Sequence, residues 1–236
     1  MQFKEQHHYN QLSNNGAPFS FVHANAYTPE CYYPLLSSFA DHFSLYCYKL
    51  KAIRDDAGVP DIKSWMDFTH DYDAFLSEKK LSNVIGIGHS IGAIMTLLAE
   101  LKTPGRFKKI ILLDPVLFSI HHQGFVLLYK LIIGHLPFVK KTYQRQVIFS
   151  SKDDVYKHYR TKHIFRYISD AHLRTLSDAL FRNDENVVKL IQSPEWEAAI
   201  YKAGSTCFPY FWKCLSQIKC PILLLAADQS NVCKQK

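Results

Sequence analysis

The sequence has little that would direct it into or across a membrane. No run of about 18 apolar residues occurs in its 236 positions, so no segment is long enough to span a bilayer as a helix. The first ten residues, MQFKEQHHYN, lack the apolar stretch of a secretory signal peptide. These absences predict a cytoplasmic protein with no transmembrane segment. The sequence leaves the oligomeric state open.

Metal-binding and nucleic-acid-binding motifs are also missing. The six cysteines show no Cys-x-x-Cys spacing, which favours reduced structural thiols over a zinc site or a disulfide framework. The charge is unbalanced toward base, with 28 Lys and Arg against 21 Asp and Glu. No nucleic-acid motif accompanies this excess, so we interpret it as a solvated surface. We expect no nucleic-acid partner, no metal and no organic cofactor.

The sequence does contain strand-like and helix-like patterns in alternation. Short β-branched or apolar runs predict strands at 19–23, 44–50, 83–87, 109–113 and 221–226, the last of these (PILLLA) buried. Helical spacing of apolar residues predicts helices at 33–39, at 65–79 and from Ile91 to the Pro104-Gly105 stop. This alternation predicts an α/β fold with a mostly parallel sheet flanked by helices, and ligands bind at the carboxyl ends of such strands.

The middle of the chain departs from this alternation. From Phe118 to about Leu215 no strand pattern is evident, and helices are expected at 172–183, 187–192 and 194–201. The predicted organisation is therefore an N-terminal core part (1–117), a helical insertion (118–216) and a last core strand (217–236).

One short segment carries the chemistry: Gly88-His89-Ser90-Ile91-Gly92, between a predicted strand and a predicted helix. A sharp strand-to-helix corner strains the residue at its apex and leaves no room for side chains at Gly88 and Gly92. Ser90 then lies at a helix N-terminus, where free N–H groups favour negative charge. Such a place suits an alkoxide and an oxyanion, and Ser90 is the candidate nucleophile.

On this motif and its flanks the chain resembles the alpha/beta-hydrolase superfamily, in particular the lipase-like and esterase-like members with a helical cap. The resemblance implies that the N–H of Ile91 is one oxyanion-hole donor. In the superfamily the first central strand ends in His-Gly, and His23-Ala24 takes that place here. The second expected donor is the N–H of Asn25, provided that Ala24 keeps a negative φ.

Two histidines beside these donors support the motif in another way. We interpret His23 as a packing and hydrogen-bonding residue, and His89 as packing beside the nucleophile.

The other two members of a catalytic triad are less clear. The superfamily's usual position for the acid, after the last predicted strand, is filled by Ser230, and Asp228 lies two residues early. Some members place the acid after the preceding strand, and we favour Asp114, at that position, over Asp228. The catalytic base is expected beyond Lys236, which implies that the final strand and helix of the fold are missing from this sequence.

The resemblance implies a serine hydrolase that cleaves a small-molecule carboxylic ester through an acyl-enzyme on Ser90. Apolar residues at the start of the insertion are candidates for a substrate pocket: Phe125, Leu128 and Ile132. A thioesterase or acyltransferase on the same fold remains an alternative, as does a ligand-binding protein that has lost its base.

Overall fold

A computed structural model describes residues 4–54, 58–59, 61–117, 137–204 and 206–230. A seven-stranded sheet with the order β1-β2-β4-β3-β5-β6-β10 forms its centre. Its strands are β1 (Lys4–Glu5), β2 (Tyr9–Gln11), β3 (Ala17–Val22), β4 (Phe43–Tyr48), β5 (Val84–His89), β6 (Phe107–Leu113) and β10 (Ile222–Leu225). Strands β4, β3, β5, β6 and β10 run parallel, and β1 and β2 add an antiparallel edge. This arrangement confirms the predicted fold class.

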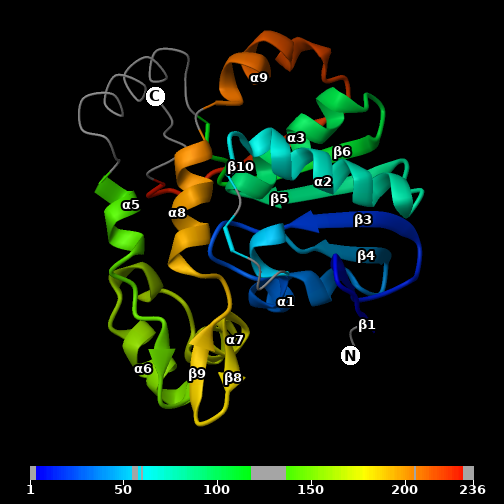
Figure 1. The fold of residues 1–236 in the computed structure, drawn as a ribbon. Coiled ribbons are helices and arrows are strands. Elements are labelled where there is room, and N and C mark those ends of the chain that lie inside the picture. The colour runs from blue at the N-terminus through cyan, green and yellow to red at the C-terminus, as the bar shows by residue number, and fades with distance from the viewer. Residues whose placement is uncertain (1–3, 55–57, 60, 118–136, 205, 231–236) are drawn as a thin grey trace.

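Helices cover both faces of this sheet (Figure 1). Those of the sheet domain are α1 (Tyr33–Leu36), α2 (Trp65–Glu78), α3 (Ile91–Lys102) and α9 (Phe208–Cys214), with 3-10 turns η1 (Pro29–Tyr32), η2 (Ser37–Phe39), η3 (Lys51–Ile53) and η5 (Leu215–Gln217). The main core contains α2, α3 and α9 with one face of the sheet. A smaller core places Leu36 of α1 against Phe19 and Phe21 on the other face. Because apolar cores cover both faces of the sheet, a ligand site is expected at the carboxyl ends of the strands.

Local signals in the sequence account for where α2 and α3 begin and end. Ser64 and Asp67 form a capping box at the start of α2, in which each side chain satisfies a backbone N–H of the first turn. Helix α3 is buried from Ile91 to Leu101, which explains its almost uninterrupted apolar sequence. It ends just before Gly105, which has a φ of +83°.

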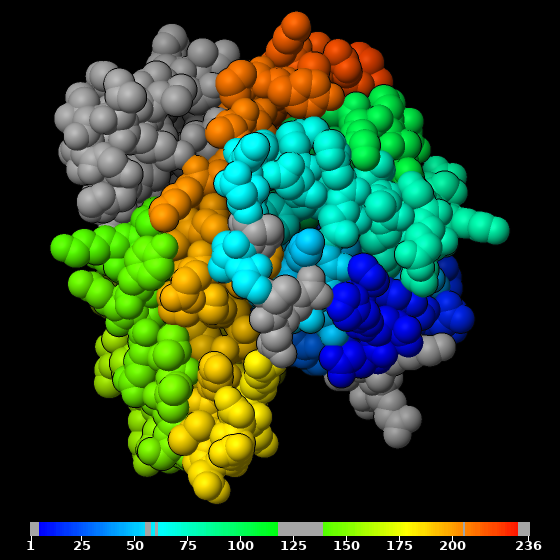
Figure 2. Space-filling view, viewed as in Figure 1, coloured from blue at the N-terminus to red at the C-terminus, as the bar shows by residue number. Residues whose placement is uncertain are grey.

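Between β6 and β10 lies a segment that includes a core of its own, and we refer to its described residues before α9, 137–204, as the insertion. It contains α5 (Pro137–Thr142), β7 (Ile148–Phe149), α6 (Lys152–Arg160), η4 (His163–Phe165), α7 (Asp170–Leu180), β8 (Phe181–Asp184), β9 (Val187–Leu190) and α8 (Pro194–Ala203), followed by α9 and η5. Residues of α6, α7 and the three strands form a separate apolar cluster. In Figure 2 these elements make up the green and yellow lobe beside the sheet domain.

The prediction of an entirely helical insertion was wrong. Strands β7, β9 and β8 form an antiparallel sheet, and β8 and β9 are a hairpin with Glu185 in the left-handed region at a φ of 51°. The alternation of buried Val188 and Leu190 with exposed Lys189 is a strand period of two, which outweighs the helical reading of 187–192.

The last strand, β10, occurs where it was predicted, but it is not buried. Its four side chains, Ile222 to Leu225, are 42–51% exposed, although the strand pairs in parallel with β6. Among the described strands β10 is one of the two edges of the sheet, and its side chains stay exposed because the described helices do not cover it. An apolar run therefore does not by itself establish burial on both faces.

Two findings on the described residues concern membrane-spanning helices and disulfides. None of their helices has the length and apolar character needed to cross a membrane. Five cysteines of the described ranges are free: Cys31, Cys47, Cys207, Cys214 and Cys220.

Candidate active site

Ser90 lies at a sharp corner between β5 and α3. Its backbone has φ 56° and ψ −117°, and its N–H donates to the Leu113 carbonyl oxygen at 3.0 Å. A Cβ on Gly88 would lie 2.3 Å from the Gly92 oxygen, and a Cβ on Gly92 would lie 2.2 Å from the Val22 oxygen. Both glycines are therefore required by close backbone approach, and the second contact brings the start of α3 against the end of β3.

Among the described residues, the Ser90 hydroxyl forms no hydrogen bond with the first turn of α3. The Ser90 side chain is half-buried and caps no N–H group of α3, unlike the N-cap serines of α2, α6, α7 and α8. The N–H of Ile91 is one of the first four in α3, which have no acceptor within the helix. A hydroxyl is thus adjacent to a helix N-terminus whose first N–H has no acceptor within the helix.

The turn after β3 contains the second expected donor, Asn25. Ala24 has a negative φ, as its place in the turn requires. Asn25 is 6% exposed, and within the described part of the chain its backbone N–H donates to no acceptor. Buried N–H groups are rarely left unpaired. This unpaired donor lies in the turn beside the start of α3, where an oxyanion hole would need it.

His23 supports this turn. It is fully buried, with Nδ1 2.8 Å from the Ala24 carbonyl oxygen and Nε2 accepting from the Leu50 N–H at 3.0 Å. Nδ1 therefore carries the proton and donates it. Burial lowers the pKa of His23 to about 4, so the ring is neutral near pH 7. Both ring nitrogens are occupied, which leaves His23 a structural residue.

Tyr32 joins the turn to the serine corner. Its hydroxyl accepts from the Ala24 N–H at 3.3 Å and forms a hydrogen bond of 2.6 Å with His89 Nδ1. Burial raises the pKa of Tyr32, which keeps the phenol protonated. Burial also lowers the pKa of His89, although the Asp114 carboxylate acts in the opposite direction. The sequence offered no motif for Tyr32, since it lies in a 3-10 turn away from both segments that it connects.

The two candidate acids occupy different environments. Asp114 is half-buried at the end of β6, has a φ of 42°, and accepts from the Ala227 N–H through Oδ1 at 3.3 Å. Its N–H donates to the Leu225 carbonyl oxygen at 2.7 Å, so it joins the ends of β6 and β10. Asp228 is exposed. Asp114 is thus held by a hydrogen bond at the carboxyl ends of the strands, where Ser90 also lies.

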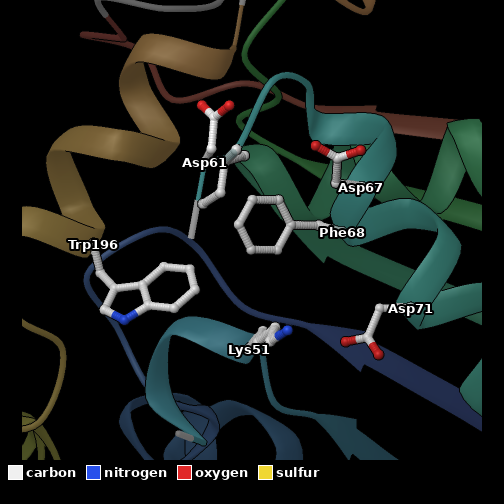
Figure 3. Close-up of a pocket in the computed structure, with 7 residues that line it drawn as sticks. Lys51, Asp61, Asp67, Phe68, Asp71 and Trp196 are labelled. Carbon is white, nitrogen blue, oxygen red and sulfur yellow. The ribbon is translucent and has the colours of Figure 1, made fainter. Parts of the chain in front are cut away.

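The candidate substrate-pocket residues Phe125, Leu128 and Ile132 lie outside the described residues. The described residues form no cluster of three or more metal-ligating side chains. A cavity of about 240 Å³ opens between α2 and α8, with Phe68 and Trp196 facing each other across it (Figure 3). Two of its carboxylates have structural partners: Asp67 caps α2, and Asp71 pairs with an arginine.

Comparison with known structures supports the fold. A peroxisomal alpha-beta-hydrolase from Saccharomyces cerevisiae is similar with a TM-score of 0.76 and 15% identity, over 95% of this chain and 68% of that chain. An alpha/beta hydrolase from Novosphingobium aromaticivorans is similar with a TM-score of 0.70 and 13% identity, over 94% and 79%. A thioesterase domain from the curacin biosynthetic pathway gives a TM-score of 0.66 at 17% identity, over 99% and 84%.

The sequence comparisons add the family. No curated protein sequence matches this chain significantly. The family model Hydrolase_4, described as serine aminopeptidase, S33, matches residues 56–236, a range that includes Ser90, Asp114 and the whole insertion. This match covers well over half of the chain, and the chain therefore belongs to this family of alpha/beta hydrolases.

Proposed function

We propose that the chain is a serine hydrolase that cleaves carboxylic esters through an acyl-enzyme on Ser90. The backbone of Ser90, with φ 56° and ψ −117°, is the observation that carries the proposal. Such a conformation costs a residue with a side chain on the order of 1–3 kcal/mol, and residues of this kind cluster at active sites. A serine that only capped α3 would accept a hydrogen bond from the first turn, and Ser90 accepts none.

In the proposed reaction the Ser90 Oγ attacks the carbonyl carbon of the ester, and the carbonyl oxygen gains the negative charge. The N–H groups of Ile91 and Asn25 donate to that oxygen, and the N-terminus of α3 favours the charge. The alcohol then leaves, and water hydrolyses the acyl-enzyme. Asp114 is the proposed acid, with Asp228 as the alternative. A base must accept the Ser90 proton, and we assign that role to no residue of the described ranges.

The preference for an ester rests on fold-level likeness together with the serine. The thioesterase domain with this fold is named for chemistry at an acyl carbon. In this proposal the insertion is a cap over the carboxyl ends of the strands, and a small-molecule ester is the substrate. The direct contact of Asn25 with α8, through a hydrogen bond from Nδ2 to the Glu197 carbonyl oxygen at 3.1 Å, supports this placement.

A fluorophosphonate probe tests the proposal, because it reacts with an activated serine whatever the natural substrate. In wild-type protein that includes the catalytic base we expect labelling and hydrolysis of p-nitrophenyl esters, and we expect neither in Ser90→Ala. Ser151→Ala is the matched control, since Ser151 is also a helix N-cap serine but lies in the insertion, where it accepts from the Asp154 N–H. Labelling that survives Ser90→Ala, or no labelling of the folded wild-type protein, would contradict the proposal and favour a non-catalytic ligand-binding protein.

A further inference from the structure

One side chain of the insertion, Gln192, reaches into the turn that follows β3. It lies between β9 and α8 and is 3% exposed. Its Oε1 accepts from the Ala26 N–H at 3.1 Å, and its Nε2 donates to Asn25 Oδ1 at 2.6 Å. Asn25 Nδ2 donates in turn to the Glu197 carbonyl oxygen. Two buried amide side chains thus connect the turn to the insertion.

The backbone at each end of this chain of bonds fixes how both amides are oriented. The Ala26 N–H can only donate, so it selects the oxygen of Gln192, and the Gln192 amino group must then face Asn25. The Glu197 carbonyl can only accept, so it selects the amino group of Asn25. Two amides in this order satisfy all three bonds.

The backbone conformation of Ala26 must also be stabilised by contacts from outside the turn. This residue has a φ of 66°, in the left-handed region. An alanine disfavours that region by about five- to thirty-fold relative to its usual conformations, whereas glycine adopts it without penalty. Conformations of this kind persist where surrounding contacts impose them. Here the N–H of Ala26 itself donates to Gln192.

Three consecutive backbone N–H groups of the turn, those of residues 24–26, differ in whether they have an acceptor. The N–H of Ala24 donates to the Tyr32 hydroxyl and the N–H of Ala26 donates to Gln192. The N–H of Asn25, between them, has no acceptor within the described residues. We propose that Gln192 is a positioning residue that aims this N–H toward the oxyanion, so that the insertion controls the oxyanion hole. The inference rests on the proposed function.

The test compares wild-type protein with Gln192→Met, which keeps the length of the side chain and removes both hydrogen bonds. We expect the rate of Ser90 phosphonylation and kcat for a p-nitrophenyl ester to fall about tenfold or more, with KM little changed, because two buried hydrogen bonds hold the donor. Ala26→Gly, added to Gln192→Met, should restore about fivefold of the lost rate, since glycine adopts the left-handed φ unaided.

Ser177→Ala is the matched control. Ser177 is a buried polar residue of the insertion whose hydroxyl donates only within α7, to the Leu173 carbonyl oxygen. It should leave the labelling rate unchanged. If Gln192→Met does not fold, Gln192→Glu replaces it: this variant keeps an acceptor for Ala26 but turns a carboxylate oxygen toward Asn25 Oδ1, and labelling should again slow. Hydrogen exchange at the Ala26 N–H, measured by NMR, should accelerate at least about tenfold in Gln192→Met, which removes the acceptor of that N–H.

The outcomes separate the two proposals. Wild-type labelling at Ser90 with an equal rate in the Gln192 variants, or unchanged exchange at Ala26 in Gln192→Met, would overturn the positioning role and leave the proposed function intact. Slower labelling without any rescue by Ala26→Gly would also overturn it, because the effect would then not act through the turn. A folded wild-type protein that is not labelled at Ser90 would refute the proposed function and the positioning role with it.

Discussion

Acidification should destabilise this fold through His23. The folded-state pKa of this buried imidazole is lowered to about 4, whereas in the unfolded chain it returns to about 6.5. Between these values the unfolded state binds more protons than the folded state, so the free energy of unfolding rises with pH. The full stability is present above about pH 6.5 and is lost as the pH falls toward 4. At ~1.36 kcal/mol for each pKa unit, the loss is on the order of 3 kcal/mol.

The measurement is equilibrium urea unfolding at several pH values from 4 to 7.5, for the wild-type protein and for His23→Asn. Other titrating groups contribute equally to both proteins, so the difference in slope isolates His23. We expect the wild-type free energy of unfolding to change by about 1.4 kcal/mol more per pH unit than that of His23→Asn in the middle of the window.

Equal slopes in wild type and His23→Asn would refute this reasoning. They would mean that His23 takes up its proton in the folded state, which the bond from the Leu50 N–H to Nε2 forbids. The turn that carries Asn25 would then have a different support.

Three other predictions follow from described contacts. Gly92→Ala should lose several kcal/mol of stability or fail to fold, because the new Cβ would lie 2.2 Å from a backbone oxygen of β3, whereas Gly58→Ala, which meets nothing within 4 Å, should keep the wild-type Tm in a thermal melt. Asp114→Asn should lower ester kcat by about 10³- to 10⁴-fold and Asp228→Asn far less; the reverse ranking in a kinetic assay would move the acid to Asp228. Leu223→Lys should reduce self-association measured by light scattering, because it charges an exposed apolar edge strand.

The sequence was sufficient for those parts of the fold that local chemistry determines. Gly88, Ser90 and Gly92 with apolar flanks predicted the corner, and the structure places a strand and a helix on either side of it. The parallel direction of β4, β3, β5, β6 and β10 also agrees with the alternation of strand and helix patterns. A correct prediction was possible here because each signal depends on residues within a few positions of one another.

Other parts depended on contacts between distant residues and were not predictable in this way. Gln192 and Asn25 lie 167 positions apart, and the resemblance that marked the Asn25 N–H gave no signal for a contact between these two side chains. Tyr32 and His89 meet across 57 positions. The β8–β9 hairpin did have a local signal, in the alternation of Val188, Lys189 and Leu190, and a shorter window would have detected it.

The strand order has a consequence during translation. Strands β3, β4, β5 and β6 arise from one continuous stretch and can pair as soon as it leaves the ribosome, but β10 pairs with β6 only after the whole insertion has been made. At typical rates of synthesis, about a hundred intervening residues take roughly 5–20 s. During that delay the outer edge of β6 has no strand beside it, and a chaperone that shields this edge would raise the yield of native protein.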